Sequence, residues 1–394
     1  MDSASTISQW FSSEYHGITS PSSAQCSFYI EADLNGGHIE IYEQPPTALE
    51  FSRLVHINRP VLIRGTATRN IFYDLHSFYS QEWKYPLFDS GTMSISLRPW
   101  TPTRFLLRLR QTGSILVCAL GPSHLVPKFS RADAVTRSLD GKLYFVEPHI
   151  EKMKMSELLS KLSRETEDLE IYYLQSQNGN VYSNQFFEGK PDPSEFESLR
   201  PDIPSEIPWC SEGLGKSPDA VNLWIGSHNS VTSIHSDPYE NIYTVVRGSK
   251  HFTLLPPTDG WCLKERMYPH GIWRRSGTGL TLTPSPNVSP IRWSSVADPD
   301  IPGKLPQQVH PIQLTVVAGE TLYLPAGWWH HVRQADNTIA LNWWYDMEMR
   351  GMAWIALSFL RGVGDVPSGN DEADVDEGED DCLQQDSAIV NRGM

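Results

Sequence analysis

The sequence predicts a mainly β protein with flanking helices, and three observations support this fold class. From residue 171 onward, short runs rich in β-branched and aromatic residues alternate with turn residues, a pattern typical of an all-β barrel or sandwich. Two stretches upstream, after Thr47 and over 156–169, have apolar residues at helical spacing. A chain of 394 residues, 39% of them hydrophobic and 20% charged, can bury one large core or two smaller ones.

The part of the chain before the β-rich region contains few clear elements. We expect residues 1–46 to be poorly structured, because their apolar residues show little periodicity. A capping-box pattern at Thr47 predicts the start of a short helix, and the apolar run 59–65 predicts a buried strand. Residues 85–140 have no clear period, so an insertion and a faulty gene model both stay open. Together, 47–165 are expected to form a helix-and-strand region that packs on the barrel.

Eight strands and their connections are predicted within a core region that covers 166–362. The strands are rich in apolar residues and cover 171–175, 220–225, 241–247, 251–255, 312–317, 321–324, 330–334 and 339–344. The link Gly248-Ser249 places glycine first, which predicts a type II′ hairpin turn. The proline-rich segment 256–311 predicts a long loop across the barrel mouth. The apolar run 347–360 predicts a helix that covers a sheet edge or forms a dimer contact.

The distribution of charge indicates what the protein does not bind. The formal net charge is −15, and residues 365–394 hold ten acidic residues and one arginine. We therefore expect 363–394 to be a disordered, solvated acidic tail. The remainder lacks the basic surface that contacts to phosphates require, so no nucleic-acid partner is expected.

The spacing of the cysteines and the hydropathy of the chain indicate in which cellular compartment the protein is expected. The five cysteines are widely spaced and include no Cys-x-x-Cys motif, which argues against a disulfide framework and against a structural zinc site. The first thirty residues lack the features of a secretory signal, and no apolar run approaches membrane-spanning length. We expect a protein of the cytoplasm or the nucleus, with no membrane partner.

Three side chains in the second half of the chain are of the types that bind a divalent metal. His235 and Asp237 are separated by one residue, and His330 lies far downstream. Two imidazoles and one carboxylate can occupy one face of an octahedral ion and leave three positions open, which is the ligand set of non-haem Fe(II) oxygenases. His331 is the alternative to His330. Alternatively, His235 and Asp237 could form a hydrogen bond at the end of a strand and bind no metal.

Lys250 is the candidate for binding a co-substrate. It lies fifteen residues after His235, at the end of a strand-turn-strand pattern, so its ammonium is expected beside the metal. A carboxylate that enters a narrow barrel loses its water, and a charged partner together with hydroxyl donors has to replace that hydration. Lys250 is therefore predicted to anchor 2-oxoglutarate.

The sequence around these residues resembles the JmjC-type oxygenases of the cupin fold. Residues 218–226 read Pro-Asp-Ala-Val-Asn-Leu-Trp-Ile-Gly, and 232–237 read Thr-Ser-Ile-His-Ser-Asp. The resemblance covers 220–345 and extends weakly back to about Thr47. It implies a double-stranded β-helix, the cupin or JmjC jelly roll, with Fe(II) and the co-substrate 2-oxoglutarate at its open end.

The resemblance also implies a role for each residue at a matching position. The metal ligands, which form the catalytic centre, are His235, Asp237 and His330. His330 is preferred to His331 because the distal ligand of the family follows a proline, here Pro325, by five residues. The implied co-substrate contacts and pocket residues are Lys250, Thr232, Tyr173, Asn241, Asn342 and Trp344. Tyr172 competes with Tyr173, which is favoured, and side chains that alternate along a strand point the two tyrosines in opposite directions.

The resemblance implies an Fe(II)- and 2-oxoglutarate-dependent protein hydroxylase. Asp237 favours this branch, because members that demethylate histones usually have glutamate at that position. The implied reaction is C3-hydroxylation of a lysine in a protein substrate. Developmentally regulated GTP-binding proteins are the expected partners, and the resemblance is also compatible with a homodimer. Two alternatives stay open. One is a metallopeptidase for histone-type basic tails, in which the same ligands hold Zn(II) and activate water; the other is a non-catalytic cupin-like interaction module.

Overall fold

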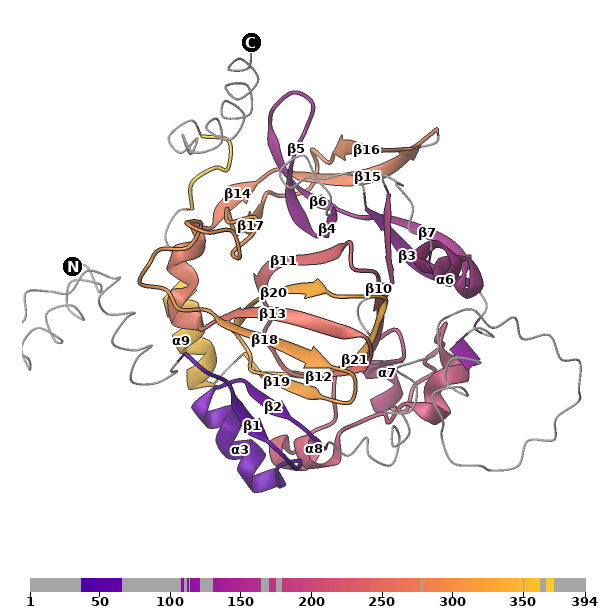
Figure 1. Ribbon diagram of the computed structural model, residues 1–394, viewed down its shortest axis with the longest axis vertical. Helices are drawn as coiled ribbons and strands as arrows, with labels where there is room; N and C mark the ends of the chain where they lie inside the picture. Colours follow the sequence, from indigo (N-terminus) through magenta and orange to yellow (C-terminus); the bar gives the residue numbers. More distant parts are fainter. Residues whose placement is uncertain are drawn as a thin grey trace, which may run out of the picture.

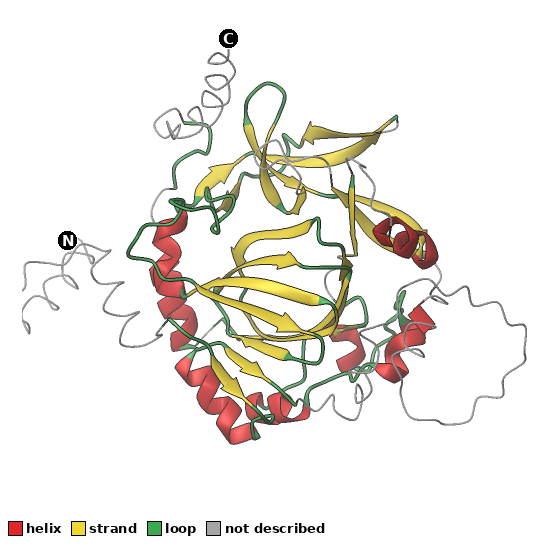
Figure 2. Cartoon of the chain, viewed as in Figure 1, coloured by secondary structure: helices red, strands yellow, loops and turns green. Residues whose placement is uncertain are grey.

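Two β-sheets that face each other form the centre of the protein, and helices pack against the larger sheet (Figure 1, Figure 2). The structure is a computed structural model, and it describes residues 37–65, 108–109, 112, 114–120, 130–163, 170–174, 179–277, 279–349, 351–361 and 366–371. Sequence predictions that concern 1–36, most of 66–129 and residues beyond 371 lie outside this described part. The architecture confirms the predicted fold class, a mainly β protein with flanking helices and a jelly-roll core.

Eight strands form the jelly roll. Their bounds are β10 (Ala220–Gly226), β11 (Ser230–Ser236), β12 (Tyr239–Arg247), β13 (Ser249–Leu255), β18 (Ile312–Val317), β19 (Thr321–Leu324), β20 (Trp329–Gln334) and β21 (Thr338–Asp346). The larger, ten-stranded sheet contains β19, β12, β21 and β10 side by side, and the smaller, five-stranded sheet contains β18, β13, β20 and β11. The inner faces of the two sheets enclose an apolar cluster that includes Val245 and Phe252.

Further strands extend both sheets. β1 (Glu40–Tyr42), β2 (Val61–Ile63), β8 (Ile171–Leu174), β3 (Ser114–Leu120) and β7 (His149–Lys154) continue the larger sheet, β9 (Tyr182–Ser183) pairs with β10, and β4 (Ser130–Ala132) pairs with β11. β3 and β4 fall within the stretch 85–140, whose sequence shows no period. Most of the described residues of that stretch therefore belong to strands.

The eight predicted strands are all present, with ends that differ from the prediction by at most two residues. β2 also confirms the strand predicted within 59–65. The sequence prediction omitted β11, which carries Thr232 and His235. Its polar residues and an irregular register, described below, hide the period-two alternation that identifies a half-buried strand.

The hairpin predicted at Gly248-Ser249 is wrong. β12 pairs with β19 and β21, whereas β13 pairs with β18 and β20, so the chain leaves one sheet at Arg247 and enters the other at Ser249. Gly248 has a φ of 75°, and a Cβ at this position would lie 2.7 Å from Oγ1 of Thr338. Glycine thus allows a sharp corner between sheets. A local pattern cannot distinguish this corner from a hairpin, because both require a positive φ.

The segment 256–311, predicted as a loop, contains regular structure. It forms the 3-10 helix η4 (Pro257–Leu263) and four strands, β14 (Arg266–Tyr268), β15 (His270–Ser276), β16 (Gly279–Pro284) and β17 (Ile291–Trp293). β15 and β16 join β5 (Ala134–Arg137) and β6 (Leu143–Glu147) in a four-stranded sheet, which lies beyond the β11 side of the smaller sheet (Figure 1). The prediction failed because prolines between these short strands dominate the composition, and because β15, which joins the segment to the four-stranded sheet, depends on pairing with the distant β6.

Helices cover the outer face of the larger sheet. α3 (Ala48–Ile57) begins with the predicted capping box, since Thr47 and Glu50 each accept a hydrogen bond from the other's backbone N–H. α8 (Pro208–Leu214) lies beside α3, and α6 (Met155–Ser163) confirms the described part of the helix predicted over 156–169. None of the helices within the described residues is long and apolar enough to span a membrane.

The C-terminal helix α9 (Met352–Arg361) confirms a helix within the predicted run 347–360, although it begins five residues later. It exposes the apolar side chains of Met352, Ile355 and Phe359. The choice between an edge cover and a dimer contact therefore stays a prediction.

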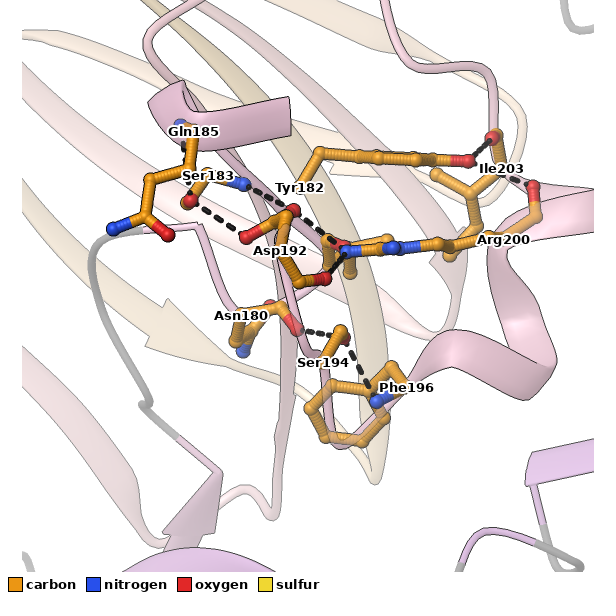
Figure 3. Close-up of polar contacts among 10 residues, drawn as sticks. Asn180, Tyr182, Ser183, Gln185, Asp192, Ser194, Phe196, Arg200 and Ile203 are labelled. Carbon is orange, nitrogen blue, oxygen red and sulfur yellow. Dashed lines mark hydrogen bonds and ion pairs between the residues drawn. The ribbon is translucent and has the colours of Figure 1, made fainter. Parts of the chain in front are cut away.

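A polar network fixes the segment that contains α7 (Asn184–Phe187) and η3 (Glu197–Asp202) (Figure 3). Asp192 accepts a hydrogen bond of 2.6 Å from Oγ of Ser183 and one of 2.6 Å from Nη2 of Arg200. The side chain of Asn180 donates to the backbone oxygen of Leu223 and accepts from its nitrogen. These bonds hold the segment against β10, which forms part of the cavity described below.

Residues 366–371, which lie within the predicted acidic tail, form hydrogen bonds with two strands. The backbone nitrogen of Met267 donates to Pro367, and the nitrogen of Gly369 donates to Met267, both at 2.9 Å. The side chain of Asn370 forms two hydrogen bonds with the backbone of Leu143. The chain is therefore paired with β14 and with the start of β6 in this short stretch.

Glu240 on β12 is predicted to make the stability of the fold depend on pH. Its buried carboxylate accepts hydrogen bonds from Oη of Tyr323 and from the nitrogen of Ala326, and burial raises its pKa from 4.5 to about 7. The folded state therefore holds the proton more tightly than the unfolded state. The tighter binding of this proton by Glu240 adds to the free energy of unfolding. The contribution is largest below about pH 4.5 and is lost as the pH rises through about 7.

We expect Glu240→Gln to reduce the fall in melting temperature between about pH 5 and about pH 8, because the amide does not ionise. Thermal unfolding followed by circular dichroism across this range measures the effect. Glu157→Gln, at an exposed position on α6, is the matched control. Identical pH profiles for the parent protein and Glu240→Gln would contradict this account.

Candidate metal and co-substrate site

A cavity of about 670 Å³ lies between the two main sheets and reaches the four-stranded sheet. All the residues that the sequence singled out as site residues line it: His235, Asp237, His330, Lys250, Thr232, Tyr173, Asn241, Asn342 and Trp344. They come from β8, β11, β12, β13, β20 and β21, and from the residue after β11. The jelly roll thus brings together side chains that are far apart in the sequence.

His235, Asp237 and His330 form a cluster of ligand type at one side of this cavity. The Oδ2 atom of Asp237 lies 3.7 Å from Nε2 of His235 and 3.8 Å from Nε2 of His330. The three ligand atoms all lie within 4.8 Å of one another. This is the two-imidazole, one-carboxylate set that holds a divalent ion on one face.

A β-bulge in β11 makes this convergence feasible. Thr232 pairs with Val332 and His235 pairs with His330, so three steps along β11 oppose two steps along β20. In a regular strand, residues three apart point to opposite faces. Because of the extra residue, Thr232 and His235 both point into the cavity. Bulges beside functional sites commonly change the direction of a side chain in this way.

Backbone carbonyl groups set the tautomer of both imidazoles. Nδ1 of His235 donates to the oxygen of Ser233 at 2.8 Å, and Nδ1 of His330 donates to the oxygen of Trp328 at 3.0 Å. Each Nδ1 therefore carries the proton, and each Nε2 presents a lone pair to the third ligand. Burial also lowers the pKa of His330 to about 4, which keeps this imidazole neutral.

His331 lies on the other face of β20, as the alternation of a strand requires. Its Nδ1 lies 3.5 Å from Oδ2 of Asp300, which also lies 3.1 Å from Nε of Arg333. Asp298 completes this group, with an oxygen 2.6 Å from Nη2 of Arg333. The guanidinium that neutralises both carboxylates makes this cluster a weaker candidate for a metal than the cavity cluster.

Lys250 lies at the deep end of the cavity. Its side chain is 2% exposed, and its ammonium donates a hydrogen bond of 3.2 Å to Oη of Tyr173. No carboxylate lies within ion-pair distance of it in the part of the chain that the structure describes, and burial lowers its pKa to about 7. A buried ammonium without a counter-ion is costly, so this end of the cavity is suited to an anionic ligand.

The two adjacent tyrosines of β8 have different surroundings. Tyr173 is buried in the cavity wall, whereas Tyr172 is part of an ion-pair network with Glu170 and Arg275. Gly226 on β10 makes room for the ring of Tyr173, because a Cβ at this glycine would lie 2.3 Å from a ring carbon. Any larger residue at Gly226 would displace Tyr173, and with it the partner of Lys250.

An amide network forms another wall, and it includes residues that the sequence analysis did not identify. Oδ1 of Asn342 accepts two hydrogen bonds, from Nε1 of Trp224 and from Nδ2 of Asn222. The Nδ2 group of Asn342 in turn donates to Oδ1 of Asn241. Asn241 therefore presents its remaining amide hydrogens to the cavity. Asn222, Trp224 and Gly226 occupy every second position of β10, so they lie on one face of the strand. This period-two spacing is the sequence signal that could have identified them.

Trp344 is the remaining predicted site residue. Its ring is parallel to that of Tyr239, at 5.0 Å between centroids, and it is 9% exposed. Its Nε1 has no hydrogen-bond partner among the described residues. A buried donor of this kind is normally satisfied, so a ligand in the cavity is the expected partner.

The comparisons with known proteins agree with this geometry. The cupin-like domain family matches residues 46–351. Lysine-specific demethylase JMJ32 of Arabidopsis thaliana is 39% identical over 256 residues, which cover 61% of this chain and 70% of the relative. The human bifunctional peptidase and (3S)-lysyl hydroxylase JMJD7 is 33% identical over 314 residues, which cover 78% and 83%.

A third relative extends the match. JmjC domain-containing protein E of Dictyostelium discoideum is 30% identical over 346 residues, which cover 81% of this chain and 86% of the relative. The family match and these relatives cover most of the chain, including every residue that lines the metal side of the cavity. The chain therefore belongs to the JmjC-type, cupin-like family of 2-oxoglutarate-dependent oxygenases, whose members depend on Fe(II).

Proposed function

We propose that the protein is an Fe(II)- and 2-oxoglutarate-dependent hydroxylase that oxidises C3 of a lysine in a protein substrate, with GTP-binding proteins as the substrate class. One observation carries the proposal. The same cavity has two imidazoles and a carboxylate on one side and, at its deep end, a buried ammonium for which the described residues offer no counter-ion. The first group fits a divalent metal, and the second fits the distal carboxylate of a dianionic co-substrate.

His235, Asp237 and His330 would hold Fe(II). Two neutral imidazoles and one carboxylate leave the ion with a net positive charge, which favours an anionic 2-oxo acid as a further ligand. When bound, Fe(II) and 2-oxoglutarate supply the oxidant by oxidative decarboxylation. The carbonyl groups of Ser233 and Trp328 keep both Nε2 atoms unprotonated and oriented for this binding.

Lys250 would pair with the distal carboxylate of 2-oxoglutarate. Oη of Tyr173, the hydroxyl of Thr232 and the amide of Asn241 lie in the same cavity and can donate the hydrogen bonds that replace its hydration. Asn342 holds Asn241 in place, and the indole of Trp344 offers a further donor. Each of these groups would bind or orient the co-substrate without taking part in the oxidation.

Two considerations favour hydroxylation of a lysine over the alternatives. The ammonium of Lys250 would have no task in a zinc hydrolase, where the metal needs only a water molecule. The carboxylate ligand is an aspartate, which the resemblance associates with the hydroxylase branch. The relatives' names include both a lysyl hydroxylase and a lysine-specific demethylase, so the product has to be identified directly.

The metal assignment predicts different effects at two adjacent histidines. We expect His330→Ala and Asp237→Ala to weaken Fe(II) binding by more than about 100-fold, beyond the loss typical of partners that only orient a ligand. His331→Gln should retain binding, because His331 faces Asp300 on the other side of β20. Titration calorimetry under anaerobic conditions measures the affinities, and melting curves verify the fold. Equal loss at both histidines would refute the assignment.

Replacement of Lys250 by methionine, which has a similar length and no charge, tests the co-substrate site. We expect the Kd for 2-oxoglutarate to rise by about 30-fold or more, because its distal carboxylate loses a buried charged partner. In the parent protein the affinity should fall as the pH rises above about 7, where the free ammonium loses its proton. An unchanged Kd, or peptide hydrolysis that survives Lys250→Met, would favour the metallopeptidase alternative.

Mass spectrometry identifies the product. A purified GTP-binding protein, incubated with the iron-loaded enzyme and 2-oxoglutarate, should gain one oxygen on a lysine, in step with succinate formation. The variant Asp237→Ala is the control, because it lacks the carboxylate ligand. Formaldehyde release from a methylated lysine would instead indicate demethylation, and the absence of succinate, even without a substrate, would refute oxygenase activity.

A further inference from the structure

Gln334 on β20 lies directly opposite Lys250 on the inner face of the smaller sheet. The two residues are in register in the antiparallel pair of β13 and β20. Side chains that are directly opposite in such a pair share a face, with Cβ atoms about 4.5–5.5 Å apart. Gln334 is also four positions from His330, so it lies on the strand face that carries this candidate metal ligand. Because Gln334 is 6% exposed, its side chain is a buried neighbour of Lys250.

Hydrogen bonds fix the orientation of the Gln334 amide. Oγ of Ser230 on β11 donates its only hydrogen to the backbone oxygen of Ser227 at 2.8 Å, so it can only accept from Gln334. Nε2 of Gln334 donates that bond at 2.9 Å. The buried Oε1 is left without a hydrogen-bond partner among the described residues. Because β20 lies between β11 and β13, the end of the amide that does not face Ser230 is the one available to Lys250.

Gly226 on β10 places this amide near the other partner of Lys250. A Cβ at Gly226 would lie 2.3 Å from a ring carbon of Tyr173 and 2.6 Å from Nε2 of Gln334. The ring and the amide therefore lie against the same glycine, at the deep end of the cavity. Gln334 does not line the cavity itself. Any effect of Gln334 on a ligand would therefore act through Lys250.

The ammonium of Lys250 can donate more hydrogen bonds than its described neighbours accept. A lysine ammonium has three donors, and Oη of Tyr173 accepts one of them. The ring of Tyr243 on β12 lies 5.3 Å from Nζ, and the cross-strand neighbour on β18 is the apolar Val316. A bond to the distal carboxylate of a co-substrate would leave a third donor. An unmatched donor and the unmatched acceptor of Gln334 thus belong to opposite residues.

We propose that Gln334 is a positioning residue for the co-substrate site. Its Oε1 accepts a hydrogen bond from Lys250, directly or through one water molecule, and keeps the ammonium charged and directed toward the anion. Hydrogen bonds to the charged form of a group favour that form, which opposes the effect of burial. An amide suits this role because it is uncharged, whereas a carboxylate in its place would pair with Lys250 and repel the anion. The inference rests on the proposed function for the identity of the anion.

Nuclear magnetic resonance of the full chain, with ¹³C at Cε of its lysines, reports the protonation of Lys250 without any co-substrate. The resonance that is missing in Lys250→Met identifies the residue. We expect the pKa of Lys250 to be about one pH unit lower in Gln334→Met, which lacks the acceptor, than in the parent protein. In Gln334→Glu, which adds a negative charge, it should be higher. A loss of packing alone would not move the pKa in opposite directions.

Titration calorimetry under anaerobic conditions, with Fe(II) and 2-oxoglutarate, measures the consequence for binding. At pH 7, Gln334→Met should raise the Kd for 2-oxoglutarate by about threefold to tenfold, and Gln334→Glu should raise it further, because its carboxylate competes with the anion. The affinity for Fe(II) should equal that of the parent protein. Gln313→Met, at an exposed glutamine of β18 in the same sheet, is the matched control and should leave the pKa and both affinities unchanged.

The outcomes separate this inference from the proposed function. If the pKa of Lys250 is the same in the parent protein and in both Gln334 variants, the inference falls, whatever the cavity binds. If the pKa moves as expected and 2-oxoglutarate binds to no form of the protein, the contact between Gln334 and Lys250 stands and the proposed function falls. A loss of Fe(II) affinity as large as the loss of 2-oxoglutarate affinity would show that the variants disturb the sheet, which also contradicts the inference.

Discussion

The register of β11 against β20 is the constraint on which the site depends. It places His235 directly opposite His330, and the bulge before His235 turns its ring to the inner side of the smaller sheet. Asp237 follows at the end of β11, where its backbone oxygen accepts a hydrogen bond of 2.9 Å from Gly327 in the loop that leads into β20. A shift by one residue in this pairing would turn the two imidazoles to opposite faces, so the geometry of the candidate metal site depends on the strand pairing.

The distribution of charge gives the cavity a direction. Among the described lining residues, the one ammonium is that of Lys250, which is 2% exposed, whereas the carboxylate of Glu147 is 51% exposed. The buried ammonium favours an anionic ligand at its end of the cavity. Strands outside the jelly roll also line the cavity, with Phe145 on β6, Ile272 on β15 and Trp293 on β17. The jelly roll supplies the residues of the candidate metal site.

Much of the fold and the ligand-type residues of the site could be predicted from local patterns of the sequence, whereas the remaining site residues, Thr232, Tyr173, Asn241, Asn342 and Trp344, were implied only by the resemblance to a family. Apolar strands, a capping box and the spacing of His235, Asp237 and Lys250 are each visible within short windows. The bulge of β11, the corner at Gly248 and the hydrogen bonds from Asn222 and Trp224 to Asn342 could not be predicted, since each depends on a partner strand distant in the sequence. The choice between His330 and His331 could be predicted only in part. Alternation shows that they point apart, but only the packing of Asp300 shows which one leaves the cavity.

The most direct test of the account is anomalous diffraction from crystals grown with Mn(II), an inert substitute for Fe(II), and 2-oxoglutarate. The account predicts one anomalous peak at coordination distance from both Nε2 atoms and from the carboxylate of Asp237, with the distal carboxylate of 2-oxoglutarate beside Nζ of Lys250. A peak at the cluster of Asp298, Asp300 and His331, or a co-substrate whose distal carboxylate faces Glu147, would contradict it.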